Sequence, residues 1–192
     1  MRVLVACEFS GIVRDAFVAL GHSAWSCDLI ASERPGRHLR CDIRDVLDSY
    51  WDLMIAHPPC TYLACSGARW WKGREREQAE ALDFVRLLLA APIDRIALEN
   101  PPGAIGSHIR SADQYIQPWE HGHGETKRTG LWLKNLPLLR PSQIVPGRAT
   151  HTHRESPSAL RSRNRSRTFP GIARAMAAQW APCVRRREPA DN

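Results

Sequence analysis

Residues 1–11 of the chain, MRVLVACEFSG, decide the expected fold. Residues 1–7 form a short, almost continuous apolar run, which is typical of a strand buried on both faces of a parallel sheet. Residues 8–11 interrupt that run, and residues 12–20 then carry apolar side chains at helical spacing. A buried strand that leads through a loop into a helix is the first unit of an α/β fold.

The rest of the chain repeats this alternation of strands and helices. Buried strands are expected at residues 23–27, 51–56, 95–98 and 130–133, and a short further segment closes at residues 42–43. Helices are expected at residues 74–91 and 169–180. We therefore expect an α/β fold in which helices flank a mostly parallel sheet. The arginine-rich run at residues 161–167, RSRNRSR, is expected to be a loop.

Length and charge indicate one compact domain with a basic end. The chain has 192 residues, of which 43% are hydrophobic and 24% are charged. That balance excludes a wholly disordered chain, a collagen and a coiled coil. Residues 151–192 hold nine Arg and three acidic residues, and so carry +6 of the net charge of +7. Such a local excess favours contact with a polyanion such as nucleic acid, and a solvated tail is the alternative.

The cysteines and the N-terminus indicate a cytoplasmic protein. Six cysteines are present, and none stands in a C-x-x-C pair. The chain begins directly with an apolar strand, without a signal peptide, and no apolar run approaches the ~20 residues that span a bilayer. Reduced thiols are therefore expected. His151, His153 and Cys183 lack a fourth ligand at the usual spacing, so we expect loop histidines and no metal.

Reactive side chains fall at the carboxyl ends of the expected strands, where α/β sheets bind their ligands. These side chains are Glu8, Asp28, Asp42, Cys60 and Glu99. Their coincidence with the strand ends is the first indication of a functional site.

Cys60 and Glu99 carry the chemistry that the sequence predicts. Cys60 follows Pro58 and Pro59, and because each proline fixes φ, the turn can present the thiol as a nucleophile. Glu99 begins a second stiff turn, Glu99-Asn100-Pro101-Pro102, and can donate or relay a proton while the sulfur attacks. The alternatives are a small buried thiol and a carboxylate that caps a helix or forms an ion pair.

These motifs, in this order along most of the chain, resemble those of the DNA cytosine-5 methyltransferases, and of small phage or prophage members of that family. Pro58-Pro59-Cys60 resembles the Pro-Cys nucleophile motif, and Glu99-Asn100-Pro101 resembles the Glu-Asn-Val motif. The remaining matches are Phe9-Ser10-Gly11 to the Phe-x-Gly cofactor loop, Asp28 to the acid at the cofactor ribose, Asp42-Ile43 to the Asp-Ile pair beside the adenine, residues 121–133 to the Gly-x-Pro-Gln-x-Arg-x-Arg segment with its strand, and residues 169–176 to the terminal helix segment.

The resemblance implies a Rossmann-like, S-adenosylmethionine-dependent methyltransferase that acts on a cytosine flipped out of DNA. Cys60 would add to carbon 6 of the base, Glu99 would hydrogen-bond N3, and carbon 5 would take the methyl group. Lys127 and Arg128 would hold the base or a phosphate, and with Arg69 they are candidates for the positive neighbour of the thiolate. The implied cofactor residues are Glu8, Phe9, Ser10, Gly11, Asp28, Asp42, Ile43 and Pro58. The implied DNA-binding residues are Pro59, Asn100, Thr126, Arg69, Trp70, Arg163, Arg165 and Arg167.

The chain departs from the family pattern in three places. The cofactor loop has one glycine, Gly11, and is preceded by Glu8, whose carboxylate could bond the cofactor's amino group. Glu125, Lys127 and Thr129 occupy the key places of the Gln-x-Arg-x-Arg motif. Residues 134–167 are too few for the independent target-recognition region that the family inserts there. We therefore expect one catalytic domain at residues 1–183, with a short basic insert at 134–167 and a disordered basic tail at 184–192.

Three other functions remain open. An amino-methyltransferase uses an Asn/Asp/Ser-Pro-Pro-aromatic turn at the same strand end, which His57-Pro58-Pro59 fits loosely. The others are a catalytically silent DNA-binding protein on the same fold, and a related cytosine-5 enzyme that transfers a different group. Trp70 and Trp71 lie beside Arg69 and Lys72, a pattern typical of stacking on bases, or of core packing by one ring with the other exposed.

Overall fold

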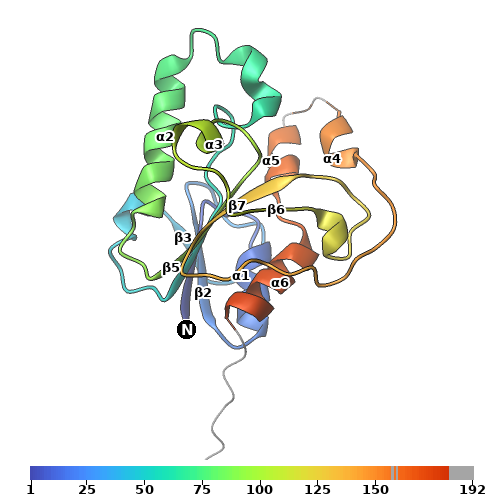
Figure 1. Cartoon of the computed structure of the whole chain (residues 1–192). Helices are drawn as coiled ribbons and strands as arrows, with labels where there is room; N and C mark the ends of the chain where they lie inside the picture. The colour runs from blue at the N-terminus through green and yellow to red at the C-terminus, as the bar shows by residue number, and fades with distance from the viewer. Residues whose placement is uncertain (157, 159, 182–192) are drawn as a thin grey trace, which may run out of the picture.

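The computed structural model describes residues 1–156, 158 and 160–181. Its centre is a seven-stranded sheet in the order β3-β2-β1-β4-β5-β7-β6 (Figure 1). The strands are β1 (Arg2–Ala6), β2 (Ser23–Asp28), β3 (His38–Arg40), β4 (Leu53–Ala56), β5 (Arg95–Asn100), β6 (Gln114–Ile116) and β7 (Thr129–Lys134). The five longer strands coincide with the predicted ones, and the expected α/β fold with a mostly parallel sheet is confirmed.

Strand β1 lies inside the sheet and pairs in parallel with β2 on one side and β4 on the other. Its alternate side chains point to opposite faces. Val3 and Val5 belong to the core on one face, and Leu4 and Ala6 belong to the core on the other. All four side chains are fully buried. The continuous apolar run in the sequence therefore follows from burial of both faces.

Helices cover both faces of the sheet (Figure 1). Helices α1 (Ile12–Ala19) and α6 (Pro170–Trp180) pack against one another on one face. Helices α2 (Glu75–Leu89) and α3 (Ala104–His108) lie on the other face. Helix α2 buries Leu82, Val85 and Leu88, which recur at helical spacing, and this explains why its amphipathic pattern was visible in the sequence.

The strand order contains a switch point between β1 and β4. The chain builds outward from β1 through β2 and β3, and then returns to the other side of β1 with β4 and β5, all in parallel. Strand β7 is antiparallel to both β5 and β6. Open α/β sheets bind ligands at such a switch point, beyond the carboxyl ends of the strands. Residues 8–11 and 57–60, which follow β1 and β4, flank this point.

The expectation of a loop at residues 161–167 is wrong. The structure forms helix α5 at Arg161–Ser166, preceded by the single-turn helix α4 (His151–Arg154). Tertiary contacts outweigh the local sequence preference here. The Nζ of Lys127 donates to the carbonyl oxygens of Arg165 and Arg167 at 2.9 and 3.5 Å. These carbonyls belong to the end of the helix, where main-chain acceptors lack helical partners.

The predicted insert at residues 134–167 packs along the segment that precedes β7. Bridges join His121 to Gln143 and Glu125 to Ala149. Within the described residues there are also three short 3-10 helices: η1 (Ile43–Asp45), η2 (Cys65–Trp70) and η3 (Pro118–Glu120). The predicted tail at residues 184–192 and Cys183 lie outside the described residues.

No helix within the described ranges combines the length and the apolar character needed to cross a membrane. The same part of the chain holds no group of three or more His, Cys, Asp or Glu side chains placed to bind a metal ion. His151 instead lies in α4, where its Nδ1 is 3.1 Å from Oε2 of Glu125.

Candidate functional site

The parallel strands bring the predicted site residues to one edge of the sheet. Glu8 and Cys60 lie just beyond β1 and β4, and Asp28 and Glu99 lie at the ends of β2 and β5. Parallel pairing of β2 with β1, β1 with β4 and β4 with β5 fixes these ends on the same side. The residues therefore line one edge, with the switch point between Glu8 and Cys60.

Cys60 lies among a carboxylate and two cations, which together we call the thiol–carboxyl site (Cys60, Glu99, Lys127 and Arg165). The Cys60 side chain is exposed. Desolvation by the protein on its other sides, and then the charge of Glu99, raise the pKa of the Cys60 thiol, while the charges of Lys127 and Arg165 lower it. The effects that raise the pKa dominate, so Cys60 rests as a thiol. The two cations nearby favour its ionisation.

Glu99 is held by His57, a residue that the sequence analysis did not select. Nδ1 of His57 lies 3.1 Å from Oε2 of Glu99, and the two side chains are only 9% and 14% exposed. Burial alone would raise the pKa of Glu99. The hydrogen bond from His57, the charge of Lys127 and the Thr129 hydroxyl outweigh burial, so the pKa lies below its ordinary value. Glu99 is therefore a largely buried carboxylate at neutral pH.

The two proline-rich turns are tied together. Nδ2 of the buried Asn100 donates to the carbonyl oxygen of Pro58 at 2.8 Å. Farther along the turns, Ala64 forms a bridge with Gly103. A side chain on Gly103 would place its Cβ 1.9 Å from the carbonyl oxygen of Leu63, so only glycine allows this approach. The turn that carries Cys60 is thus fixed against the turn that follows Glu99.

Glu8 shapes the loop after β1. Gly11 occupies the N-cap of α1 with a left-handed φ of 71° and offers no capping side chain. Glu8 fills that role from three residues upstream: its Oε1 accepts from Val13 N at 2.7 Å and from Ser10 Oγ at 3.0 Å, and its Oε2 accepts from Arg14 N at 3.3 Å. Both oxygens face the helix rather than a ligand, unlike the contact considered from the sequence.

Asp28 and Asp42 face the same thiol. This thiol belongs to Cys7, which has a left-handed φ of 57°. Burial, followed by the charges of Asp28 and Asp42, raises the pKa of Cys7 to about 12. Asp42 also caps η1 through Arg44 N at 2.9 Å. The buried Ile43 follows it. Two of the predicted cofactor carboxylates are therefore neighbours.

Helix α5 turns two predicted DNA-binding residues toward the loop after β1. Arg163 and Arg167 both form ion pairs with Glu33, at 3.2 and 2.6 Å. Their guanidinium carbons lie 4.8 and 5.9 Å from the ring centre of Phe9. Both arginines thus hold α5 against the residues predicted to bind the cofactor, whereas Arg165 belongs to the thiol–carboxyl site.

Other predicted residues contact partners outside the thiol–carboxyl site. The guanidinium carbon of the exposed Arg128 lies 4.1 Å from the ring centre of Tyr115 on β6. The Thr126 hydroxyl donates to the carbonyl oxygen of Ala149 at 3.0 Å. Glu125 accepts from Thr152 N at 2.7 Å, and so caps α4. Arg128 and Thr126 therefore have structural partners of their own.

The two tryptophans after the Cys60 turn have different surroundings. Trp70 is 70% exposed, with Arg69 stacked on its ring at 4.9 Å. Trp71 packs against the core on the α2 face of the sheet. One indole is therefore structural, and the other is available to a partner.

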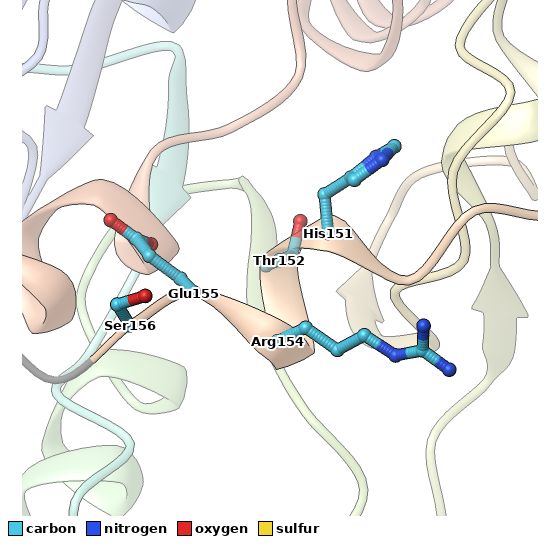
Figure 2. Close-up of a pocket in the computed structure, with 5 residues that line it drawn as sticks. All are labelled: His151, Thr152, Arg154, Glu155 and Ser156. Atoms are coloured by element: carbon cyan, nitrogen blue, oxygen red, sulfur yellow. The ribbon is translucent and has the colours of Figure 1, made fainter.

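A surface hollow elsewhere lacks the features of a reactive site. It is lined by the α4 region, namely His151, Thr152, Arg154, Glu155 and Ser156. Figure 2 shows that the His151, Arg154 and Glu155 side chains extend in different directions and do not converge on one point. The chemistry therefore concentrates at the strand ends.

No protein-family model matches the chain, and no curated protein matches it. The functional argument therefore starts from the site itself.

Proposed function

We propose that the protein is a DNA (cytosine-5-)-methyltransferase that acts through a covalent intermediate on Cys60. The proposal rests on one observation above all: Cys60 follows β4 and Glu99 ends the neighbouring parallel strand β5, and the Asn100 hydrogen bond to the Pro58 carbonyl at 2.8 Å ties the two segments together. A nucleophile and a carboxyl group that face one substrate from two fixed turns suit attack on an electron-poor ring. The surrounding motifs resemble those of cytosine-5 methyltransferases, so we infer that the ring is cytosine.

Cys60 supplies the nucleophile. Its exposure lets a flipped base approach the sulfur. The thiolate adds to carbon 6 of cytosine, and Lys127 and Arg165 favour that thiolate through their charge. Asn100 holds the Pro58 carbonyl, and with it the turn that aims the sulfur.

Glu99 meets the opposite side of the ring. A hydrogen bond from its carboxyl group to N3 offsets the negative charge that the ring gains when sulfur adds to carbon 6. Carbon 5 then becomes the nucleophile. Loss of the carbon-5 proton and elimination of Cys60 restore the aromatic ring after transfer.

The carboxylates at the neighbouring strand ends suit the ribose of S-adenosylmethionine. Asp28 and Asp42 are carboxylate neighbours around Cys7 and can accept from a ribose diol. The loop at residues 8–11 passes beside them, with Gly11 at the start of α1. S-adenosylmethionine, when bound, supplies an electrophilic methyl group. Glu8 contributes by holding the loop to α1, and Phe9 contributes an aromatic ring on the α5 side.

DNA is the proposed partner, held mainly through its backbone. Arg69 and the exposed Trp70 present a cation and an indole just beyond the Cys60 turn, a combination that suits stacking on a base. Arg165 adds positive charge at the thiol itself. Residues 134–167 form a short insert along the segment before β7, so we expect weak sequence selection.

The decisive experiment traps the proposed intermediate. The protein is incubated with S-adenosylmethionine and DNA that contains 5-fluorocytosine, whose fluorine replaces the proton that elimination requires. Mass spectrometry should find a covalent adduct on Cys60. Cys60→Ser should abolish the adduct. Cys65→Ser is the matched control because Cys65 is a second exposed thiol five residues away, and its adduct should match the wild type.

Each alternative has its own outcome. Methylation of DNA that survives Cys60→Ser would identify an amino-methyltransferase. Retention of DNA without adduct or product would identify a silent binding protein. An adduct with a modified base of a different mass would identify transfer of another group.

A further inference from the structure

The largely buried pair of His57 and Glu99 crosses the thiol–carboxyl site from the end of one strand to the end of the next. His57 follows β4 and Glu99 lies at the end of β5, so the 3.1 Å contact between Nδ1 and Oε2 joins neighbouring parallel strands. The exposed fractions of 9% and 14% show that bulk water reaches neither group freely. Within the described part of the chain, Nε2 of His57 is buried and has no hydrogen-bond partner.

The charge of Glu99 poses a chemical problem for the proposed reaction. N3 of neutral cytosine accepts a hydrogen bond, and a carboxylate also only accepts. Two acceptors facing each other repel and cannot offset charge on the ring. Glu99 must therefore carry a proton when it meets N3, although its surroundings favour the carboxylate. The proton must come from a group in direct contact with Glu99.

We propose that His57 is a positioning residue that passes a proton to Glu99, so that Glu99 can protonate N3 of the target base. The inference rests on the proposed function and extends it to a residue outside the recognised motifs. Histidine is the side chain whose ordinary titration lies nearest neutral pH, and it can hold a proton for a neighbouring carboxylate. The contact through Nδ1 leaves Nε2 to carry the proton that completes the imidazolium.

The proton balance of the addition step is closed. The exposed Cys60 thiol releases its proton to solvent, and the S–C6 bond forms as the electron pair of the C5–C6 double bond moves through C4 to N3. The imidazolium of His57 gives its Nδ1 proton to Glu99, and Glu99 gives the proton to N3, which leaves His57 neutral. One proton has thus gone from sulfur to solvent, and one from His57 to N3. At elimination N3 returns its proton through Glu99 to His57, and the departing thiolate regains a proton from solvent, so neither an oxidant nor a reductant is required.

The groups that face the pair set its pH response. Lys127 approaches Glu99 from the segment that leads into β7, and Thr129 approaches it from the first position of β7. Cys60 faces Glu99 from the turn after β4, and Arg165 faces Cys60 from α5. Lys127 and Arg165 are positive and oppose an extra proton on the pair, while an ionised Cys60 favours it. The charges of Lys127 and Arg165 therefore act on Cys60 and on the proton that the pair shares.

The test compares how pH changes adduct formation on 5-fluorocytosine DNA in two backgrounds. His57→Asn keeps an N–H donor toward Glu99 but cannot carry a second proton. We expect it to slow adduct formation at pH 8 by about 10²-fold, and to move the alkaline fall of the rate to lower pH. Glu99→Gln donates a permanent N–H to N3, so adding His57→Asn to it should change the rate less than threefold. His108→Asn, at an exposed histidine on α3, is the matched control and should keep the wild-type profile.

The outcomes separate this role from a structural one. An equal loss from His57→Asn in both backgrounds, or an unshifted pH profile, overturns proton transfer by His57 while leaving the methyltransferase intact. The imidazole ¹⁵N chemical shifts of His57 give a readout without DNA: they should change at neutral pH when Glu99 becomes Gln, and unchanged shifts overturn the pairing. Absence of any wild-type adduct overturns both the proposed function and the role of His57.

Discussion

Arg167 and Glu33 form a two-point ion pair across 134 residues of sequence, with Nε 2.9 Å from Oε2 and Nη2 2.6 Å from Oε1. Arg163 approaches the same carboxylate at 3.2 Å. Phe9 lies beneath both guanidinium groups. The pair therefore joins α5 to the loops after β1 and β2, the part of the sheet edge proposed to hold the cofactor.

Removal of the Glu33 charge should loosen α5. Glu33→Gln leaves Arg163 and Arg167 without their shared partner, and a partly exposed pair of this kind is worth up to about 1 kcal/mol. We expect trypsin to cleave native protein within residues 161–167 roughly fivefold faster. The control is Glu80→Gln, which breaks the exposed pair with Arg76 on α2 and should leave that cleavage unchanged.

Low pH should loosen α5 as Glu33→Gln does, because protonation also removes the charge of Glu33. The hydrogen bond from Arg167, partly opposed by burial, lowers the pKa of Glu33. A carboxyl group whose pKa is lowered in the folded protein stabilises the fold at pH values above its ordinary pKa. That stabilisation is lost as the pH falls through the lowered pKa. The wild type should therefore become as susceptible to an acid-active protease at low pH as the variant. Equal cleavage rates for both proteins at neutral pH would contradict the role of Glu33.

Arg14 should be a strong determinant of stability. Its side chain is fully buried, and its guanidinium donates to Ser26 Oγ and the Pro35 carbonyl while pairing with Asp15 at 2.8 Å. Arg14→Leu removes the donor to the buried Ser26 hydroxyl and to the Pro35 carbonyl, and leaves Asp15 without its cation, so we expect the free energy of unfolding in urea to fall by about 3 kcal/mol. Arg76→Leu at an exposed site on α2 should change it by less than about 0.5 kcal/mol. Similar losses for both variants would show that the buried contacts are not specific.

The sequence could predict the strands at the centre of the sheet because burial on both faces leaves an uninterrupted apolar run. It could also place the reactive residues at strand ends, since parallel pairing carries those ends to one edge. Strand β6 (Gln114–Ile116) and helix α3 (Ala104–His108) are only three and five residues long, too short for a periodic pattern to stand out.

Contacts between distant residues could not be predicted in the same way. Helix α5 and the residue after it contact Glu33 and Lys127, and neither lies near them in sequence. His57 was visible as a titratable residue directly before Pro58, but only the pairing of β4 with β5 shows that it meets Glu99. Glu8 caps α1 because Gly11 has no side chain to do so, and a glycine at a helix start was the available signal.

Lys127 and Glu99 should shift the reactivity of Cys60 in opposite directions. The Lys127 charge lowers the pKa of the thiol and the Glu99 charge raises it. Because only the thiolate reacts with iodoacetamide, Lys127→Met should slow alkylation of Cys60 at pH 8 by roughly three- to tenfold, and Glu99→Gln should speed it by a similar factor. Lys127→Arg keeps the charge and should remain near the wild type. Peptide mass spectrometry can follow Cys60 with Cys65 as the internal reference, and shifts of the same sign would contradict the arrangement.

Asn100 should control both the stability and the aim of the Cys60 turn. Its buried Nδ2 bonds the Pro58 carbonyl at 2.8 Å. Asn100→Ala removes the donor and should cost about 1–3 kcal/mol in urea unfolding. Asn100→Asp keeps the shape but sets an oxygen against that carbonyl, so it should cost more than Asn100→Ala. Gln78→Ala is the matched control. It removes a partly buried hydrogen bond from the Gln78 side-chain amide to the Tyr62 carbonyl at 3.0 Å, and should lower the free energy of unfolding less than either Asn100 variant. Because the bond fixes the turn, both Asn100 variants should also lose adduct formation at Cys60 under conditions where they remain folded. A variant that loses stability but forms the adduct at the wild-type rate would show that the turn needs no such anchor.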